Sequence, residues 1–277
     1  MSKDIKIVFH LADIHLRTYR MHKEYGEIFK KTLIKIKELS KGYNREEVRI
    51  VIAGDYVHQK ITISNELLLL GTWFLKNLEK IAPIVLIAGN HDLLENNKDR
   101  LDSLTPMVQL LNELDIRYYK NTECILDNNI VWCVYSVFDD NSRPNIEEAR
   151  EKYGDDKMYY GLFHAPINGA STDIGYIFDN SETLAHFKGC DAVLCGDIHK
   201  RQTLNYKNGN KMTPVVYSGS LIQQNFGESI ENHGFLLWDV KSNEFKEFNI
   251  DSEYGFYQFK ISSIDDIENN SEILTNE

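Results

Sequence analysis

The stretch IKIVFHLADIH (residues 5–15) joins an apolar run of strand length to a polar ending, and four later stretches repeat this arrangement. They are VRIVIAGDYVH (48–58), PIVLIAGNHD (83–92), YYGLFHA (159–165) and DAVLCGDIH (191–199). Each apolar run has the length and composition of a buried strand. Ligands of open α/β sheets bind beyond the carboxyl ends of the strands. We therefore expect the five polar endings to meet in one site.

The polar endings contain residue types that bind metals or move protons. They supply Asp13, His15, Asp55, His58, Asn90, His91, His164, Asp197 and His199. One Asp-x-His or Gly-Asp pair is a common polar turn, but turns do not explain five such endings in order. Carboxylate, imidazole and amide-oxygen ligands suit manganese, iron or zinc. Two such ions about 3.5–4 Å apart can activate a hydroxide for attack on a phosphoester, so the set predicts a two-metal phosphoesterase centre.

The segments between these strands predict an α/β fold. Apolar spacing favours helices over 23–40, 64–80, 101–114 and 145–152. Ser64 is a candidate N-cap, and Asn128-Asn129 is a hairpin signal among the short strands of 117–137. From residue 202 onward strands dominate. This order predicts two packed β-sheets flanked by helices, in four αββα layers.

Composition limits the class of protein. The chain has 277 residues, 42% hydrophobic content and a formal net charge of −11. That charge argues against a protein that coats nucleic acid unaided, because basic patches supply most non-specific affinity. Bound divalent ions and the acidic segment 251–277 weaken this objection. No apolar run approaches the roughly 20 residues of a membrane-spanning helix, and the N-terminus lacks a signal-peptide pattern, so we expect a cytoplasmic, intracellular protein without membrane association.

Several residues near the polar endings receive structural interpretations. The four cysteines, Cys124, Cys133, Cys190 and Cys195, form no CxxC pair, so we expect buried free thiols rather than a zinc site. His10 and the Tyr159-Tyr160 pair are expected in the core. Basic residues follow the first and last endings. We expect them at the solvated surface, with contact to phosphates near the site as the alternative; they are Arg17, Arg20, Lys23, Lys200 and Arg201.

The motifs together resemble a known superfamily. The set Asp13-x-His15, Gly54-Asp55-x-x-His58, Gly89-Asn90-His91-Asp92, His164 and Gly196-Asp197-x-His199 is similar to that of the calcineurin-like metallophosphoesterases. Within them the chain most resembles, over about residues 4–240, the SbcD-type DNA repair nucleases of cells and phages. The runs YSGS (217–220) and NFGE (225–228) add to this resemblance. Protein phosphatases of the superfamily carry an acidic residue and an Arg after Gly-Asp, whereas this chain has Tyr56-Val57-His58.

The resemblance implies a role for each site residue. One ion would be held by Asp13, His15 and His199, the other by Asn90, His164 and Asp197, and Asp55 would bridge them. His91 would act on the scissile phosphate or its leaving group, His58 would stabilise the transition state or orient the substrate, and Asp92 would fix His91. The superfamily has His-x-His where this chain has Asp197-Ile198-His199. The added carboxylate favours Mn²⁺, with Mg²⁺, Fe²⁺ and Zn²⁺ as alternatives.

The resemblance also implies an activity and partners. The expected activity is metal-dependent DNA hydrolysis, as an exonuclease on duplex ends and an endonuclease on single strands or hairpins. Such nucleases work as homodimers with an SbcC-like coiled-coil ATPase in DNA repair and recombination. Residues 1–250 would form the nuclease domain, and 251–277 a tail or the start of a truncated capping domain. Two alternatives stay open: a phosphodiesterase or phosphomonoesterase for small nucleotides, and a non-catalytic binding scaffold.

Overall fold

Two mixed six-stranded sheets form the centre of the fold, which confirms the predicted α/β sandwich. The computed structural model describes residues 3–139, 142–179, 182–208, 211–258 and 261–269. The first sheet has the order β12-β11-β1-β2-β3-β4. Its strands are β1 (Ile7–Leu11), β2 (Val48–Ala53), β3 (Ile84–Ile87), β4 (Ile116–Tyr118), β11 (Gly234–Asp239) and β12 (Glu244–Asn249).

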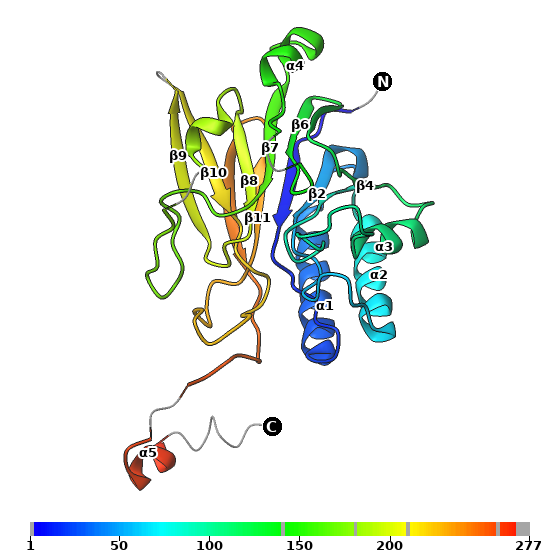
Figure 1. Cartoon of the computed structure of the whole chain (residues 1–277). Coiled ribbons are helices and arrows are strands. Elements are labelled where there is room, and N and C mark those ends of the chain that lie inside the picture. The colour runs from blue at the N-terminus through cyan, green and yellow to red at the C-terminus, as the bar shows by residue number, and fades with distance from the viewer. Residues whose placement is uncertain (1–2, 140–141, 180–181, 209–210, 259–260, 270–277) are drawn as a thin grey trace.

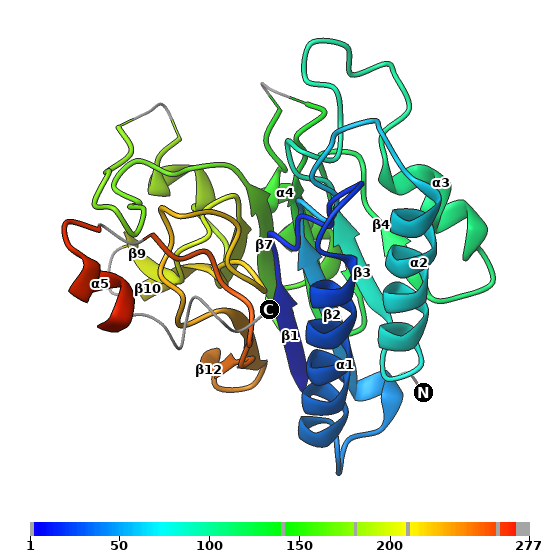
Figure 2. The same ribbon diagram turned by 90° about the horizontal axis from the view of Figure 1, so that it is seen from below.

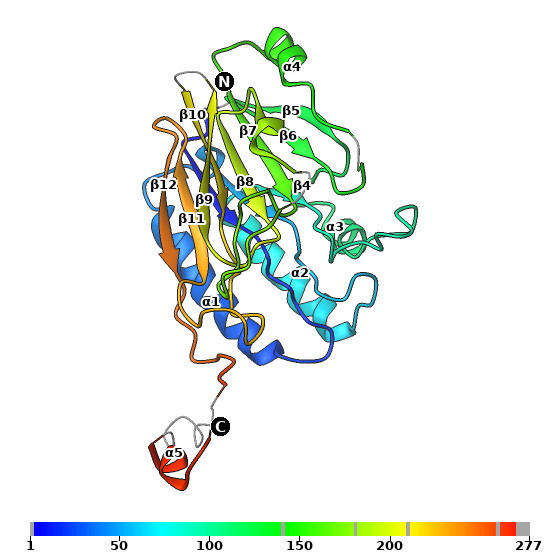
Figure 3. The same ribbon diagram turned by 60° about the vertical axis from the view of Figure 1, so that its left-hand side comes forward.

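The second sheet faces the first and has the order β5-β6-β7-β8-β10-β9. Its strands are β5 (Glu123–Asp127), β6 (Ile130–Tyr135), β7 (Met158–His164), β8 (Ala192–Gly196), β9 (Gln202–Asn208) and β10 (Lys211–Tyr217). Figure 3 shows these strands beside one another. β5 and β6 are antiparallel neighbours joined at Asn128 and Asn129, which confirms the predicted hairpin.

Helices cover the outer faces of the sandwich. α1 (His22–Leu39), α2 (Asn65–Glu79) and α3 (Leu104–Leu110) lie on the outer side of the first sheet (Figure 1). Figure 2 shows α1 and α2 running side by side along it. The remaining helical elements are α4 (Ile146–Tyr153), two 3-10 turns, Arg45–Glu47 and Leu184–Phe187, and α5 (Ile264–Asn269). No helix among the described residues has the length and apolar character needed to cross a membrane.

The ends of two helices test the sequence-based expectations. α2 begins as predicted, since the Ser64 hydroxyl accepts a hydrogen bond of 3.2 Å from the Leu67 backbone N–H. The helix expected over 101–114 is only seven residues long. It starts later because the Asp102 carboxylate accepts hydrogen bonds from the backbone N–H groups of Leu104 and Thr105, at 3.0 and 2.8 Å. Residues beyond Leu111 form a turn that leads into β4.

Alternating side chains of the buried strands build separate apolar layers. In β1, Ile7 and Phe9 pack with the core under α1 and α2, whereas Val8 packs with the core between the sheets. Tyr159 and Tyr160 are fully buried on opposite faces of β7, as predicted. This period of two is the expected pattern for strands covered on both faces. Because both faces of these strands are covered by apolar layers, polar side chains are accommodated at the strand ends.

The parallel strands bring the five polar endings to one edge. β1, β2 and β3 are mutually parallel in the first sheet, and β7 and β8 are parallel in the second. Two hydrogen bonds join the sheets there. The His164 ring Nδ1 lies 2.7 Å from the Ala53 carbonyl oxygen, and the Asp197 backbone N–H donates to the Asp13 carboxylate at 2.9 Å.

A buried ion pair joins the two sheets near the opposite end of the strands. Arg49 of β2 donates two hydrogen bonds to the Asp127 carboxylate of β5, at 2.7 and 2.8 Å. Arg117 and the Trp132 indole N–H contact the same carboxylate, at 2.7 and 3.1 Å. The Arg49 and Asp127 side chains are 1% and 4% exposed, so this cluster belongs to the interior.

Candidate metal centre

The backbone at the strand ends adopts an unusual conformation. Four of the candidate site residues have positive φ angles, Asp13 (50°), His15 (49°), Asp55 (52°) and Asp197 (93°). Asp, Asn and His are the non-glycine residues that tolerate this left-handed region best. The backbone N–H of His15 donates to the Asp55 carbonyl oxygen at 2.9 Å. The turns after β1 and β2 therefore hold one another in this conformation.

Asp55 lies at the centre of the site. One carboxylate oxygen, Oδ2, is 3.4 Å from Nε2 of His15, and the other, Oδ1, is 3.2 Å from Nε2 of His164. The backbone N–H of His91 also donates to Oδ1, at 2.8 Å. The Asp55 side chain is 2% exposed. A single buried carboxylate thus faces imidazole nitrogens on two sides.

Two overlapping groups of donor atoms surround Asp55. Asp13, His15 and His199 form one group, and Asp13, Asp55 and His164 form another, with the ligand atoms of each group within 4.8 Å of one another. The Nε2 atoms of His15 and His199 face each other at 2.9 Å. Two further oxygen donors lie beside the second group.

Those oxygens come from Asn90 and Asp197. The Asn90 amide oxygen lies 3.3 Å from Nε2 of His164, and the nearer Asp197 oxygen lies 3.9 Å from the same atom. All seven residues predicted as metal ligands therefore lie together at this edge. Glycine keeps the space open, since a Cβ at Gly89 would collide with both Asp55 and His164.

The buried carboxylates and imidazoles perturb one another's pKa values. Burial lowers the pKa of His164, but the Asp55 charge and hydrogen bond outweigh it and raise that pKa well above its usual value. Burial raises the pKa of Asp13 to about 7, although His164 and His199 act in the opposite direction. Without cations the ligand atoms of His164 and Asp13 thus favour protons, and divalent ions would compete for those positions.

His58, His91 and Asp92 lie beside the metal ligands. The rings of His58 and His91 stack with centroids 5.0 Å apart. Together with His15 they form a third group of possible metal ligands, whose nitrogen atoms lie within 4.8 Å of one another. The carbonyl oxygen of His58 is 2.8 Å from Nδ1 of His91. Burial and the charge of Arg17 lower the pKa of His58 to about 4, so its imidazole is neutral at pH 7.

Asp92 braces the loops rather than contacting an imidazole directly. Its carboxylate accepts hydrogen bonds from the backbone N–H groups of Gly89 and Val57, at 2.8 and 2.9 Å, and from that of Tyr56 at 3.3 Å. Burial and the Asp55 charge raise the pKa of Asp92 to about 8, and the backbone donors oppose this shift. Asp92 can therefore influence the position of His91 only by holding the backbone of the loop that contains both residues.

Glu228 is a contact of the site that the motif analysis did not single out. Its carboxylate lies 2.6 Å from Nδ1 of His199 and is 7% exposed. Burial lowers the pKa of His199, but the hydrogen bond to Glu228 and the Asp13 charge raise it to about 9. The only sequence feature that pointed to Glu228 was the run NFGE at 225–228, which was used as part of the resemblance to SbcD-type nucleases and not to identify a site residue.

Two of the basic residues near the site are buried, so the expectation of a surface position was wrong for them. The Arg17 guanidinium donates to the Gln224 carbonyl oxygen at 2.9 Å, and Arg201 donates to the Ser218 carbonyl oxygen at 3.2 Å. Arg17 is 5% exposed, and so is the side chain of Arg201; carbonyl oxygens of the loop after β10 accept a hydrogen bond from each guanidinium group. Arg20 and Lys23 are exposed as predicted.

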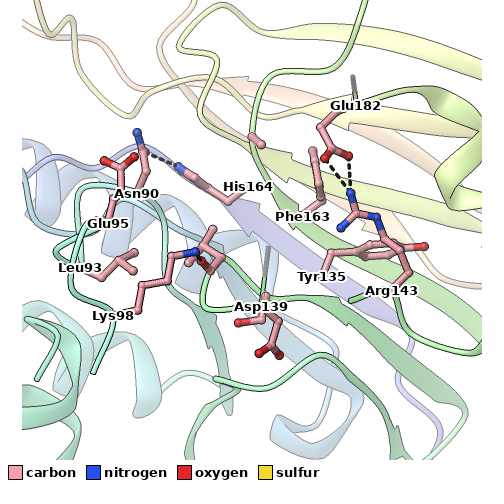
Figure 4. A pocket seen from close by; sticks show the side chains of 13 residues that line it. Asn90, Leu93, Glu95, Lys98, Tyr135, Asp139, Arg143, Phe163, His164 and Glu182 are labelled. Carbon is pink, nitrogen blue, oxygen red and sulfur yellow. Dashed lines mark hydrogen bonds and ion pairs between the residues drawn. The ribbon is translucent and has the colours of Figure 1, made fainter. Parts of the chain in front are cut away.

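A pocket of about 320 Å³ adjoins the donor atoms (Figure 4). Asn90 and His164 form the wall that it shares with the metal centre. On the far side an Arg143–Glu182 ion pair of 2.6 Å lies across it. Tyr135 and Phe163 contribute its aromatic wall. The pocket gives room for a small group next to the donor cluster.

The donor set fits divalent ions of intermediate hardness. It combines carboxylate oxygens, imidazole nitrogens and an amide oxygen, and the groups described above include no thiolate. All four cysteines are free thiols as expected; Cys133, Cys190 and Cys195 are buried, whereas the expected burial was wrong for Cys124, which is partly exposed on the edge strand β5. Such O and N donors suit Mn²⁺, Fe²⁺ or Zn²⁺.

Comparisons with known proteins agree with this chemistry. A model of the calcineurin-like phosphoesterase family matches residues 7–201. An uncharacterized protein of Acanthamoeba polyphaga mimivirus is 37% identical over 264 residues, a match that covers 93% of this chain. This chain spans only 19% of that relative's length.

Two further matches are more distant. An SbcCD nuclease subunit from Staphylococcus epidermidis is 24% identical, over 87% of this chain and 67% of that protein. Among solved structures, a cold-active protein-tyrosine phosphatase of a psychrophilic Shewanella species matches 88% of this chain and 80% of its own, with 12% identity and a TM-score of 0.39.

Proposed function

Because the chain belongs to the calcineurin-like phosphoesterase family, whose members are metal-dependent hydrolases, we propose that it is a DNA nuclease. The observation that carries the proposal is the position of Asp55, whose two oxygens face His15 on one side and His164 on the other. A carboxylate in this position suits a bridge between two cations. The similarity to an SbcCD nuclease subunit supports DNA as the substrate.

The seven ligands would hold two divalent ions, with Mn²⁺ expected first. Asp13, His15 and His199 would bind one ion, Asp55 would bridge, and three residues would bind the other, namely Asn90, His164 and Asp197. When bound, such ions lower the pKa of water and neutralise charge on phosphate oxygens. The third carboxylate, Asp197, makes the second group more anionic and favours a hard cation.

His91 and His58 would act on the phosphoester itself. A carbonyl oxygen can only accept a hydrogen bond, so the contact with the His58 carbonyl places a proton on Nδ1 of His91. Nε2 of His91 then faces the site, and in the doubly protonated imidazolium form of the ring it would give its proton to the leaving oxygen, with the Nδ1 proton kept by the His58 carbonyl oxygen. The neutral His58 beside it would orient the phosphate. The pocket next to Asn90 would receive the adjoining nucleoside.

The proposal includes a homodimer that works with an SbcC-like coiled-coil ATPase. An apolar groove of about 760 Å³ between α2 and α3 supports an interface on the first sheet's side. Leu69 and Leu110 border this groove and are 71% and 64% exposed. Light scattering should give twice the chain mass for the wild type, and the Leu69→Glu variant should be monomeric; a monomeric wild type would contradict the dimer.

The test of the activity is cleavage of end-labelled duplex DNA with Mn²⁺. We expect the wild-type chain to release mononucleotides and His91→Ala to release none, while both bind Mn²⁺. Ser64→Ala is the control, because this residue caps α2 away from both the donor atoms and the pocket.

Other outcomes separate the alternatives. Hydrolysis of a small chromogenic diester without DNA cleavage would replace the nuclease by a phosphodiesterase for small nucleotides. Inertness toward both substrates, with Mn²⁺ bound, would establish a non-catalytic scaffold. Failure to bind divalent ions would contradict the metal centre as a whole.

A further inference from the structure

The segment 251–257 lies against the loop that carries Glu228. The backbone N–H of Phe256 donates to the side-chain oxygen of Gln223 at 2.6 Å, and the Gln223 amide nitrogen donates back to the Phe256 carbonyl at 3.3 Å. Gln223 is 2% exposed. One buried amide therefore holds the backbone of the C-terminal segment in both directions.

The same amide holds the loop on its other side. The Gln223 amide nitrogen also donates to the carbonyl oxygen of Glu228, at 3.0 Å. The Glu228 carboxylate accepts hydrogen bonds from the backbone N–H of Gln224 at 2.8 Å and from the Asn225 amide at 2.6 Å. The same carboxylate also lies 2.6 Å from Nδ1 of His199. Hydrogen bonds thus run without a gap from Phe256 to the imidazole.

We propose that residues 251–257 form a strap that positions His199 for metal binding through Gln223 and Glu228. This inference rests on the metal-binding part of the proposed function and is independent of which phosphoester is hydrolysed. A carboxylate on one ring nitrogen of a histidine fixes the ring and its tautomer, so that the other nitrogen faces the metal. Here Nδ1 contacts Glu228, and Nε2 faces His15.

The strap is attached to the body by few contacts. The Tyr254 hydroxyl donates to Glu27 of α1 at 3.0 Å, and Lys31 donates to the Asp251 carbonyl oxygen at 2.9 Å. The Phe256 ring meets Phe226 edge-on, with centroids 5.2 Å apart. A hollow of about 510 Å³ lies between the strap and α1. A segment with so few buried contacts detaches at a lower free-energy cost than the core unfolds. A force on the chain beyond residue 257 would therefore detach the strap and leave the His199 ring without its fixed orientation.

The test compares two amides that clamp distant backbone. Gln223→Met removes the three hydrogen bonds of the strap amide while keeping the side chain's length. Asn129→Leu is the control, because the Asn129 amide clamps the backbone of Ile5 in both directions, at 2.7 and 3.0 Å, at the other end of the strands. Calorimetric titration of the full chain with Mn²⁺ gives the affinities, and the metal-free melting temperature gives the structural cost.

We expect Gln223→Met to weaken one Mn²⁺ affinity by about tenfold, the lower end for residues that orient a metal ligand, and Asn129→Leu to leave both affinities unchanged. In a Glu228→Gln background, Gln223→Met should add no further loss, since both act through the same imidazole. If Gln223→Met does not fold, Tyr254→Phe should weaken the same affinity by about threefold.

Two results would overturn the strap while leaving the metal centre intact. One is an equal effect of Gln223→Met and Asn129→Leu on Mn²⁺ affinity. The other is an additive loss in the Glu228→Gln background, which would mean that Gln223 acts independently of Glu228. A wild-type chain that binds no Mn²⁺ would overturn the proposed metal centre, and the strap with it.

Discussion

The two ends of the sandwich join the same pair of sheets with opposite charge arrangements. Near the amino end of β2, the Asp127 carboxylate is met by two guanidinium groups, those of Arg49 and Arg117. At the carboxyl end, Asp13 and Asp55 are met by imidazoles, and among the described residues no lysine or arginine side chain forms an ion pair with either. The arginines of the Asp127 cluster neutralise its carboxylate, whereas the carboxylates of Asp13 and Asp55 are neutralised only when protons or cations bind.

This difference separates stability from function. A buried carboxylate costs free energy unless it is paired. The arginine-paired cluster meets that requirement within the chain, so its contribution belongs to folding. The carboxylate-rich cluster meets it only with added positive charge, which is a property of binding sites. Substitutions at either end, and one at neither, should separate the two properties.

The largest effect is expected from Asp55→Asn. The substitution keeps the side chain's shape but removes the charge shared by the two ligand groups. We expect phosphodiesterase activity and Mn²⁺ affinity to fall by more than about a hundredfold, beyond the loss seen for residues that only orient ligands. The metal-free protein should melt at a somewhat lower temperature, since the charge and hydrogen bond of Asp55 that stabilise protonated His164 are weakened. Retained Mn²⁺ binding would contradict the bridging position.

Asp127→Asn should lower stability without changing the affinity for Mn²⁺. Arg49 would remain buried without a carboxylate, and breaking a buried pair in this way costs about 3–5 kcal/mol of unfolding free energy. Urea denaturation measures this loss. Mn²⁺ affinity and activity per folded molecule should match the wild type, and a loss of affinity would show that the two ends are coupled.

The acid stability of the protein should depend on Asp127. Burial alone would raise its pKa, but hydrogen bonds and charge from Arg49 hold that pKa below its usual value. A depressed carboxyl pKa stabilises the folded state above the unfolded pKa of about 3.9 and loses this contribution as pH falls through the folded pKa. Below about pH 4, metal-free wild type should therefore lose stability more steeply than Asp127→Asn. Parallel pH profiles from urea titrations would argue against the charge as the cause.

The smallest effect is expected from Ser64→Ala, which touches neither end. It removes the hydroxyl that caps α2, and such caps contribute about 1 kcal/mol. The urea midpoint should shift accordingly, with no change in Mn²⁺ affinity. A change in Mn²⁺ affinity would mean that general loss of stability alters the site, and that the other comparisons need correction for it.

The position of the candidate ligands at one edge could be predicted from sequence because each residue ends a local pattern. An apolar run followed by Gly-Asp-x-x-His is visible within a dozen residues, and parallel strands place such endings at one edge. The same holds for Ser64 and for the Asn128-Asn129 turn, where cause and structure are adjacent. The order of these elements was enough to predict the two-sheet sandwich.

Contacts between segments far apart in the chain could not be predicted from local sequence patterns. Glu228 meets His199 across 29 positions, and the Arg17 guanidinium meets Gln224 across 207. Nothing local distinguishes a buried arginine from an exposed one, so the surface position expected for Arg17 failed. The same applies to the Arg49–Asp127 pair, whose members belong to different sheets. Such pairings become visible only when the packing is known.

The left-handed backbone at Asp13, His15, Asp55 and Asp197 restricts how this centre can change over evolution or in the laboratory. β-branched side chains are strongly disfavoured there, whereas Asp, Asn, His and Gly are tolerated. Substitutions that accumulate at these positions should therefore be restricted to these few residue types, most of which still offer an oxygen or nitrogen ligand atom. A mutant library designed to alter metal preference can be limited to the same residue types, because backbone strain would destabilise most other variants whatever their ligand chemistry.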